Sequence, residues 1–457
     1  MPRDSRNRWI STPIAGVLAV ASAVSCAPAP KREEPLRVPA TVSAHEPAPP
    51  GMTPIVPLAR AEDAAGPHGW TSPPEEDGSS GATLDWMLTD ENEPRPFFGG
   101  GLVPLPGGGV ATSAFSSTHK VSALTHWDEA GIRRSWQNHP RVLGPLEATR
   151  DGALYATAAS PETNTTGDLS LLQFDPTLHR AWERTVKGEA TRLAVNGEGQ
   201  ALVVLRDVHA APLASLTLFD RDGRERWTVP IHATGEEYTS LFVQAAAVDA
   251  RGRFMLVAEG RGRIDWKDQR LGLEDSPYTL LLTLSEDGSP LEHRLVPGGW
   301  GTVSALATDE AGRIAVLGRI IGTLEHAGVT ITQPPNEAGA QRPYLLVLDG
   351  LQAQTGALLE RRTCSQFPGW ERVSFLGDGR IFLTCDGGAY VVEKTGWMTA
   401  LPVAESCESS ACELRIGDHA VGSDGAIYVT GAVSQKRSAG TYDRSHGFLQ
   451  RWVLTPH

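Results

Sequence analysis

The chain has 457 residues and a formal net charge of −13 at pH 7, and 40% of its residues are hydrophobic. A general nucleic-acid binder needs a basic surface to displace counterions from phosphates, so the acidic balance argues against that class and we expect no nucleic-acid partner. The length would suit about two or three domains, but a closed all-β repeat fold can hold one core over such a chain, so the repeats must decide the domain count.

Residues 1–25 are predicted to be an export signal. Arg3, Arg6 and Arg8 precede an apolar stretch that covers residues 14–24. This stretch is too short to span a bilayer comfortably, and a basic start followed by a short apolar run is typical of secretion signals. We therefore expect the remaining chain to be exported.

The end of this signal resembles the lipobox of bacterial lipoproteins. It reads Ala23-Val24-Ser25-Cys26, with Ala23 where that family most often has leucine. The resemblance implies that Cys26 is acylated and becomes the new N-terminus, and two or three acyl chains anchor a soluble domain stably. In a Gram-negative cell, Ala27 after the cysteine favours the outer membrane, on its periplasmic side or at the cell surface. The alternative is an ordinary signal peptidase site after Ala23, with Cys26 incidental.

Residues 26–81 are predicted to be a disordered tether. They are rich in Pro, Ala and Glu, as in "APAPKREEPLRVPA" and "TSPPEEDGSSG". Such a composition cannot bury enough apolar surface to offset its conformational entropy, and its prolines favour extended segments. The tether would let a folded domain stand away from the lipid surface.

Residues 82–457 repeat a pattern of short, alternating apolar runs and tight Asp and Gly turns. Each unit has two hairpins and hence four strands. A period of about 50 residues is what a four-stranded propeller blade requires, and each blade needs neighbours to bury its faces. We therefore predict an all-β fold, a seven-bladed β-propeller, with six or eight blades as the alternatives. The seven units align on Gly109, Gly152, Gly199, Gly252, Gly312, Gly379 and Gly425.

The two ends of the repeat region are predicted to close the ring together. The last unit ends after its third strand, in "GFLQRWVLTPH", and an unpaired apolar segment, residues 82–88, precedes the first unit. We expect residues 82–88 to supply the missing outer strand of the last blade, because this removes an exposed sheet edge.

Some units resemble known propeller repeats. Phe174-Asp175 followed by Trp182, and residues 218–227, are similar to the repeats of pyrroloquinoline-quinone-type propellers, in which an aspartate turn precedes a tryptophan that packs between blades. Other units resemble short repeats of secreted bacterial propellers. The units at Leu284 and Leu348 lack the tryptophan. These resemblances imply a way to build a blade and not an activity.

The longest connections are expected to be loops on one face, because the other turns are tight. They are residues 259–278 and 320–344. Loops on a rigid scaffold often carry binding sites, so Trp266, Trp300 and Trp370 are candidate contacts on this face. The alternative is that these tryptophans pack between blades.

Four cysteines follow Cys26, and an even number in an exported chain favours disulfides. We expect Cys407 to pair with Cys412, and Cys364 with Cys385, which would join neighbouring blades. A zinc site with four sulfur ligands is the alternative, although the chain has no C-x₂-C pair.

No nucleophile elbow, zinc-protease motif or phosphate loop is present, so no catalytic residue, metal or cofactor is assigned. We expect a monomeric, lipid-anchored module, not an enzyme, that binds a protein or glycan of the cell envelope. One alternative is an envelope-assembly factor similar to the propeller lipoprotein of the outer-membrane β-barrel machinery. The other is a propeller enzyme, either a quinoprotein dehydrogenase or a glycan-cleaving enzyme, which would need carboxylates, Tyr or His converging on the central channel.

Overall fold

A computed structural model describes most of the repeat region and the strand before it. All of the described residues lie in the compact unit Pro47–His457. The predicted export signal, residues 1–25, and the predicted tether, residues 26–81, lie outside the described residues. The described residues are 82–89, 101–116, 120–159, 169–206, 212–234, 239–299, 301–326, 329–333, 341–359, 371–385, 388–393, 398–401, 403, 412–436 and 442–454.

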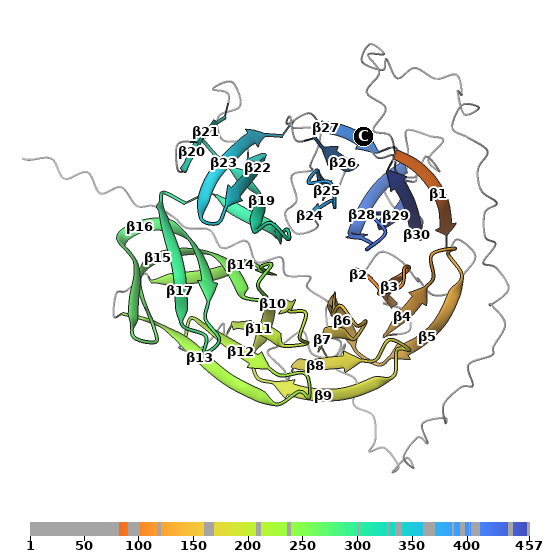
Figure 1. Ribbon diagram of the computed structural model, residues 1–457, viewed down its shortest axis with the longest axis horizontal. Helices are drawn as coiled ribbons and strands as arrows, with labels where there is room; N and C mark the ends of the chain where they lie inside the picture. Colours follow the sequence, from red (N-terminus) through yellow and green to blue (C-terminus); the bar gives the residue numbers. More distant parts are fainter. Residues whose placement is uncertain are drawn as a thin grey trace, which may run out of the picture. The chain divides into compact units, whose positions relative to one another are not determined.

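Every regular element in these residues is a β-strand. The strands form five separate four-stranded sheets, one eight-stranded sheet and a two-stranded hairpin. The sheets follow one another around a ring in chain order, so the arrangement is propeller-like (Figure 1).

Three of the four-stranded sheets use only consecutive strands. In the fourth, a hairpin separates the second and third strands along the chain, and the fifth is completed by the N-terminal strand. The consecutive sheets are β2 (Leu102–Pro104), β3 (Val110–Ser116), β4 (Val121–Trp127) and β5 (Arg133–His139); β6 (Val142–Ala148), β7 (Leu154–Ala159), β8 (Leu169–Phe174) and β9 (Arg180–Val186); and β24 (Arg372–Phe375), β25 (Ile381–Cys385), β26 (Gly388–Val392) and β27 (Met398–Leu401). The other two are β18 (Thr302–Thr308), β19 (Arg313–Ile320), β22 (Arg342–Asp349) and β23 (Gln352–Leu358); and β28 (Cys412–Val421), β29 (Ile427–Lys436), β30 (Tyr442–Leu454) and β1 (Ala82–Thr89).

The eight-stranded sheet contains two successive runs of four strands. The runs are β10 (Glu189–Val195), β11 (Ala201–Arg206), β12 (Ala214–Phe219) and β13 (Glu225–Ala233), and then β14 (Ser240–Val248), β15 (Phe254–Trp266), β16 (Gln269–Leu284) and β17 (Pro290–Pro297). The two-stranded hairpin is β20 (Thr323–His326) with β21 (Val329–Thr332).

The first strand of each four-strand run lies at the centre of the ring. These strands contact one another in the cyclic order β2, β6, β10, β14, β18, β24, β28 and again β2. The buried hydrophobic side chains fall into seven clusters, each between two neighbouring runs. The core of this unit is therefore a ring of interfaces between sheets.

The repeat glycines lie in the turns between the first and second strands of the runs. All seven have φ between 79° and 87°, a left-handed conformation that L side chains rarely adopt. In the turn after β14, the Asp249 carboxylate accepts hydrogen bonds from the backbone N–H groups of Arg251 (2.9 Å) and Arg253 (2.8 Å). The Asp and Gly spacing in the sequence therefore marks the same turn, between the first and second strands, in successive runs around the ring.

Tryptophans on outer strands connect neighbouring runs. The indole N–H of Trp182 on β9 donates to the carbonyl of Arg221 (2.9 Å), and that of Trp227 on β13 donates to Glu286 (2.7 Å). Both acceptors lie in the turn between the third and fourth strands of the next run. These side chains thus help to fix the spacing of adjacent sheets.

The N-terminal strand β1 forms the outer edge of the last sheet. It pairs antiparallel with β30, from Ala82 opposite Leu454 to Thr89 opposite Phe448. The sheet order β1-β30-β29-β28 places it where the sequence requires an outer strand. Arg451 adds an ion pair to Asp85 and another to Asp424 (2.8 Å).

Replacement of Leu88 by aspartate should destabilise the propeller. Leu88 is buried in a cluster with Val110 and Leu449, so a carboxylate there would lose its hydration among apolar side chains. We expect Leu88→Asp to lower the free energy of unfolding by at least about 3 kcal/mol, measured by urea denaturation. Thr83→Asp, at an exposed position of the same strand, is the control. Equal losses in both variants would contradict a core role for β1.

The connection predicted as a binding loop at residues 259–278 is instead a long hairpin that folds back into the core. β15 and β16 pair from Met255 opposite Thr283 to Trp266 opposite Gln269, with a register shift after Arg261. Gly262 and Gly272 have φ of 78° and 99° at this shift. A side chain at Gly272 would place its Cβ 2.3 Å from the Gly262 carbonyl oxygen, so only glycine permits the bend.

The tip of this hairpin joins the two runs of the eight-stranded sheet. Its end pairs with β13, with Trp266 opposite Ile231. The Trp266 indole N–H donates to the Gly288 carbonyl (3.1 Å), and Lys267 Nζ lies 2.6 Å from the Asp287 carboxylate, both in the turn after β16. The hairpin tip therefore contacts both the preceding run, at β13, and the turn between β16 and β17 of its own run.

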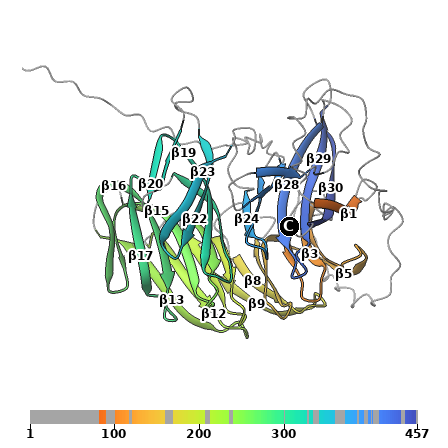
Figure 2. The ribbon, with the colours of Figure 1, turned by 45° about the horizontal axis from the view of Figure 1, so that its top comes forward.

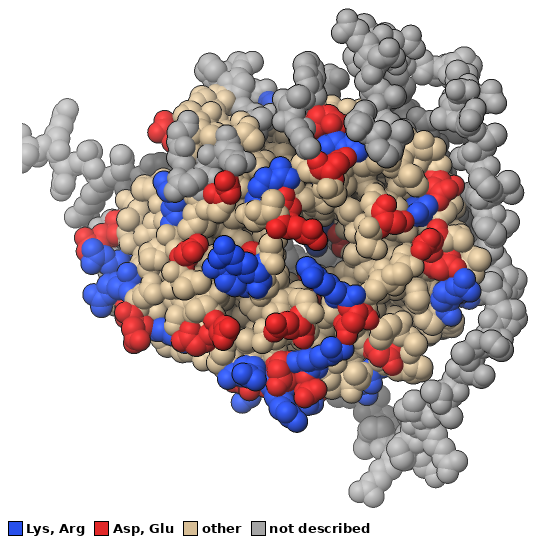
Figure 3. Space-filling model, viewed as in Figure 1, with Lys and Arg blue, Asp and Glu red and all other residues tan. Residues whose placement is uncertain are grey.

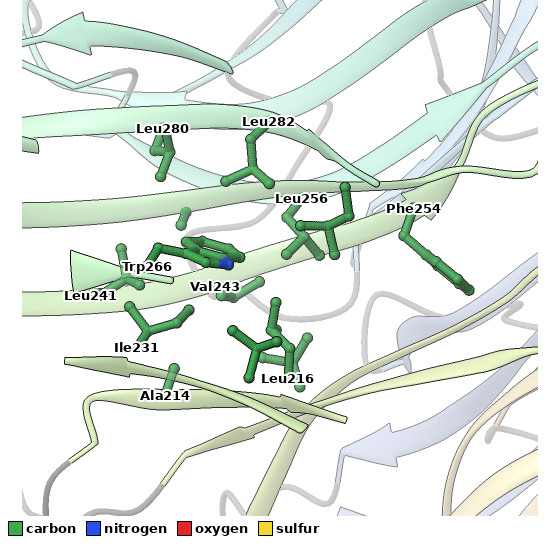
Figure 4. Close-up of a cluster of buried hydrophobic side chains, with 14 of the residues drawn as sticks. Ala214, Leu216, Ile231, Leu241, Val243, Phe254, Leu256, Trp266, Leu280 and Leu282 are labelled. Atoms are coloured by element: carbon green, nitrogen blue, oxygen red, sulfur yellow. The ribbon is translucent and has the colours of Figure 1, made fainter. Parts of the chain in front are cut away.

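Trp266 is consequently not an exposed contact, and its expected place on a binding face is wrong. Its side chain is fully buried among Leu216, Ile231, Leu256 and other aliphatic residues (Figure 4). Burial of the large indole beside a carbonyl acceptor satisfies both its apolar surface and its N–H group. The alternative interpretation from the sequence, packing between neighbouring strand runs, describes this residue.

The second expected loop, residues 320–344, contains a similar folded-back hairpin. β21 lies against β23 (Figure 1), and Figure 2 shows β20 in the same region near β23. Leu324 and Ile331 are buried in the cluster between β14–β17 and the next sheet. His326 Nε2 lies 3.1 Å from the Leu351 carbonyl, in the turn after β22, so His326 is a buried packing residue on β20.

Candidate functional site in the central channel

The first strands of the runs surround an opening, and Figure 3 shows basic and acidic side chains around it. Five of these strands, β6, β10, β14, β18 and β28, contain a β-bulge. A bulge sets two residues opposite one and re-aims the side chain that follows, which is why bulges recur beside functional sites. Arg192 and Asp418 directly follow the bulged residues of β10 and β28.

Asp418 connects β28 to the first strands on both sides. Its carboxylate accepts hydrogen bonds from the backbone N–H groups of Leu102 on β2 (3.1 Å) and of His419 (2.8 Å). It also lies 3.2 Å from Nε of Arg372 on β24. Burial raises the pKa of Asp418, while Arg372 and the two N–H donors oppose that rise. Asp418 thus fixes the Arg372 guanidinium in the channel.

Glu147 on β6 carries a carboxyl group that interacts electrostatically with Arg372 and Asp418. Desolvation inside the channel raises the pKa of Glu147 to about 8, Arg372 lowers it and Asp418 raises it further. Within the described part of the chain, nothing hydrogen-bonds this carboxyl. At pH 7 the group is therefore mostly protonated, and as a neutral acid it can donate a hydrogen bond.

Arg192 on β10 provides a second guanidinium. Its Nε donates to the Gln244 carbonyl and its Nη1 to the Thr191 carbonyl. Desolvation lowers the pKa of Arg192, and the like charge of Arg372 lowers it further, which places the two cations within electrostatic reach. The guanidinium remains charged near neutral pH, and no carboxylate among the described residues forms an ion pair with it.

A cavity of about 290 Å³ has walls from β2, β18, β24 and β28, and Glu147, Arg192 and Arg372 are not among its lining residues. Ser374 and His419 form part of its polar lining, together with Phe375 and Ala420. The His419 ring lies 2.8 Å from Thr384 Oγ1 and 2.9 Å from Ser374 Oγ. Burial lowers the pKa of His419 to about 3, so its imidazole is neutral and holds β28 against β24 and β25.

This arrangement can do two kinds of chemistry. Two guanidiniums and a neutral carboxyl donor can hold an oxyanion, since arginine N–H groups match carboxylate and phosphate oxygens. A carboxyl with a pKa near 8 can also act as a general acid. The sequence pattern does not indicate these residues, because Glu147, Arg192 and Arg372 lie on three different repeats and share no local motif.

The site residues expected from the sequence are only partly within the described chain. Cys26, Cys364, Cys407, Trp300 and Trp370 lie outside the described residues. Cys385, at the end of β25, is buried and disulfide-bonded. The pairings of Cys385 with Cys364 and of Cys407 with Cys412 stay predictions.

Among the described residues, no helix is long and apolar enough to cross a membrane. In the same residues, no group of three or more His, Cys, Asp or Glu side chains could hold a metal ion.

No family model and no curated protein sequence matches the chain. Among solved structures, the polysaccharide lyase Uly1 is similar at 9% identity, covering 78% of this chain and 90% of that one, with a TM-score of 0.45. A subtype N11 neuraminidase-like protein of A/flat-faced bat/Peru/033/2010 (H18N11) is similar at 9% identity, covering 77% and 95%, with a TM-score of 0.40. The gluconolactonase XC5397 of Xanthomonas campestris is 13% identical, covering 78% and 98%, with a TM-score of 0.34. Similarities at this level carry no argument about substrate or reaction.

Proposed function

We propose that the chain is an exported, lipid-anchored seven-bladed β-propeller that binds a protein or glycan of the cell envelope in its central channel, without catalysing a reaction. Cys26 would carry the lipid in the outer membrane, and residues 26–81 would hold the propeller away from the bilayer. The propeller-like fold is compatible with binding and scaffold roles, since rigid sheets position side chains from many parts of a chain.

The count of seven blades is supported by the strand runs. The cyclic contacts join seven first strands, and the hydrophobic clusters between runs are also seven. On this interpretation, the eight-stranded sheet is two blades that the tip of the β15–β16 hairpin joins at β13.

The observation that carries the binding proposal is the convergence of Glu147, Arg192, Arg372 and Asp418 on the channel from four strand runs. Charged groups in a confined, poorly hydrated space are costly for folding, so their presence favours a functional role. The long connections of residues 259–278 and 320–344, where a binding face was expected, instead place Trp266 and His326 in the core.

Affinity capture from gently solubilised cell envelope tests this proposal. The full chain is used as bait, with co-purifying proteins and sugars identified by mass spectrometry. We expect Arg192→Glu to abolish recovery of the ligand, because it reverses a channel charge. Arg226→Glu is the matched control, since Arg226 lies exposed on the outer strand β13. A ligand recovered equally with both variants would contradict binding in the channel.

A glycan-cleaving enzyme is the second candidate, and the neutral carboxyl of Glu147 favours it. A protonated carboxyl can serve as general acid for cleavage of a glycosidic bond. The same capture experiment separates the two functions. A binding module returns the glycan at its original length, whereas an enzyme shortens it, and Glu147→Gln would then stop the shortening.

A further inference from the structure

An exposed aromatic ring lies near the start of β14, one of the strands that border the channel. The ring belongs to Phe242, which is 43% exposed. The Arg206 guanidinium, at the end of β11 in the preceding run, lies 4.3 Å from the centre of this ring. The cation–π contact holds both side chains in place without burying them, and aromatic and arginine side chains are enriched in protein interfaces.

Two further arginines flank this pair along β14. Arg192 on β10 donates from Nε to the backbone carbonyl of Gln244, two residues after Phe242. Arg261 on β15 is opposite Ser240, two residues before Phe242. Both arginines are exposed. One arginine therefore lies beside each of three alternate positions of β14, and these positions are about 6–7 Å apart because a strand rises about 3.3 Å per residue.

The positive charge of these three arginines is not neutralised locally. None of them has an ion-pair partner within the described part of the chain. Two carboxylates lie on the paired strands, since Glu189 is opposite Arg206 and Glu259 is opposite Phe242. Gln244 Nε2 donates to the Glu259 carboxylate, and burial raises the pKa of Glu259. The surface thus keeps an excess of positive charge in a chain with a net charge of −13.

We propose that the surface formed by Arg192, Arg206, Phe242 and Arg261 binds an extended acidic peptide of a partner protein, with carboxylates at alternate positions. This rests on the proposed function, because it names the class of protein ligand. An extended peptide directs every second side chain to one side, at intervals of about 6–7 Å, which matches the spacing of the arginines along β14. Guanidiniums hold carboxylates through charge-assisted hydrogen bonds.

A peptide fits this surface better than an anionic polymer of another class. The Arg206 guanidinium covers one face of the Phe242 ring, which leaves less of the ring for stacking against a sugar. The exposed part of the ring can still contact an apolar side chain of a peptide. The net charge of −13 argues against a nucleic acid, which needs a broad basic surface.

Titration of the full chain with synthetic peptides, followed by fluorescence anisotropy at low ionic strength, tests the proposal. The first peptide repeats Asp-Ser, the second has the same composition with all aspartates before all serines, and the third repeats Asn-Ser. We expect the Asp-Ser repeat to bind about threefold or more tightly than the peptide with grouped aspartates, and about tenfold or more tightly than the Asn-Ser repeat.

Variants of exposed residues locate the binding surface. Arg206→Gln and Arg261→Gln should each weaken the Asp-Ser repeat by about threefold to tenfold, because each removes one guanidinium. Phe242→Leu should also weaken it, since the ring that holds Arg206 is lost. Arg226→Gln, at an exposed position of the outer strand β13, is the matched control and should bind as the wild type does. Thermal unfolding of each variant checks that the fold is intact.

Several outcomes would overturn the inference. Equal binding of the Asp-Ser repeat and the peptide with grouped aspartates would contradict the role of spacing, and unaltered binding by Arg206→Gln would contradict the surface. Tighter binding of polygalacturonate than of the Asp-Ser repeat would assign the surface to a glycan instead. If envelope capture were still abolished by Arg192→Glu, only this inference would fail, and if capture were also unaffected, the proposed function would fail with it.

Discussion

Trp266→Ala should lower the free energy of unfolding by about 3–5 kcal/mol, the range typical of buried aromatic side chains replaced by alanine. The indole lies fully buried between β10–β13 and β14–β17, and its loss would leave a cavity and an unpaired carbonyl at Gly288 (Figure 4). Denaturant unfolding measures the change directly.

Trp136→Ala is the matched control for this variant. Trp136 on β5 is 37% exposed, so its truncation should cost less than about 1 kcal/mol. A small effect of Trp266→Ala, or equal effects of the two variants, would contradict the folded-back position of the β15–β16 hairpin.

Glu371→Ala should destabilise the protein by about 3–5 kcal/mol, because it leaves a buried cation without its partner. Arg319 on β19 and Glu371, next to β24, are 2% and 3% exposed, and Arg319 Nε lies 2.6 Å from the Glu371 carboxylate. The ion pair joins two neighbouring sheets. Urea denaturation of the single variant at pH 7 gives the loss.

The double variant Arg319→Met with Glu371→Leu tests the physical reason. Apolar residues of similar size remove both buried charges, so we expect most of the lost stability to return. A double variant as unstable as Glu371→Ala would mean that shape, and not the uncompensated charge of Arg319, determines the loss.

The local elements were predictable to different degrees. Repeat glycines such as Gly252 mark turns because a left-handed φ is a local requirement that few other residues meet. The pairing of residues 82–88 was predictable because this apolar run has no partner strand in its own repeat, and an unpaired strand would leave an exposed sheet edge. By contrast, residues 259–278 and 320–344 were predicted to be loops because they are long connections between repeat strands, whereas each contains a hairpin.

The candidate site could not be predicted in the same way. Glu147 and Arg372 are separated by most of the propeller region, and neither belongs to a motif with a fixed spacing. Their proximity depends on the closure of the whole ring of first strands. A raised pKa at Glu147 likewise arises from desolvation in the channel, which no property of residues 142–148 indicates.

The sequence by itself determined that residues 82–457 form repeated antiparallel strands with tight turns, because alternation and turn chemistry act over a few residues. The tertiary structure alone decided that Trp266 is buried and that Arg372 and Asp418 form an ion pair between two first strands. The physical reason is that burial and electrostatic coupling depend on which distant strands become neighbours, and that choice is made by the packing of the complete ring.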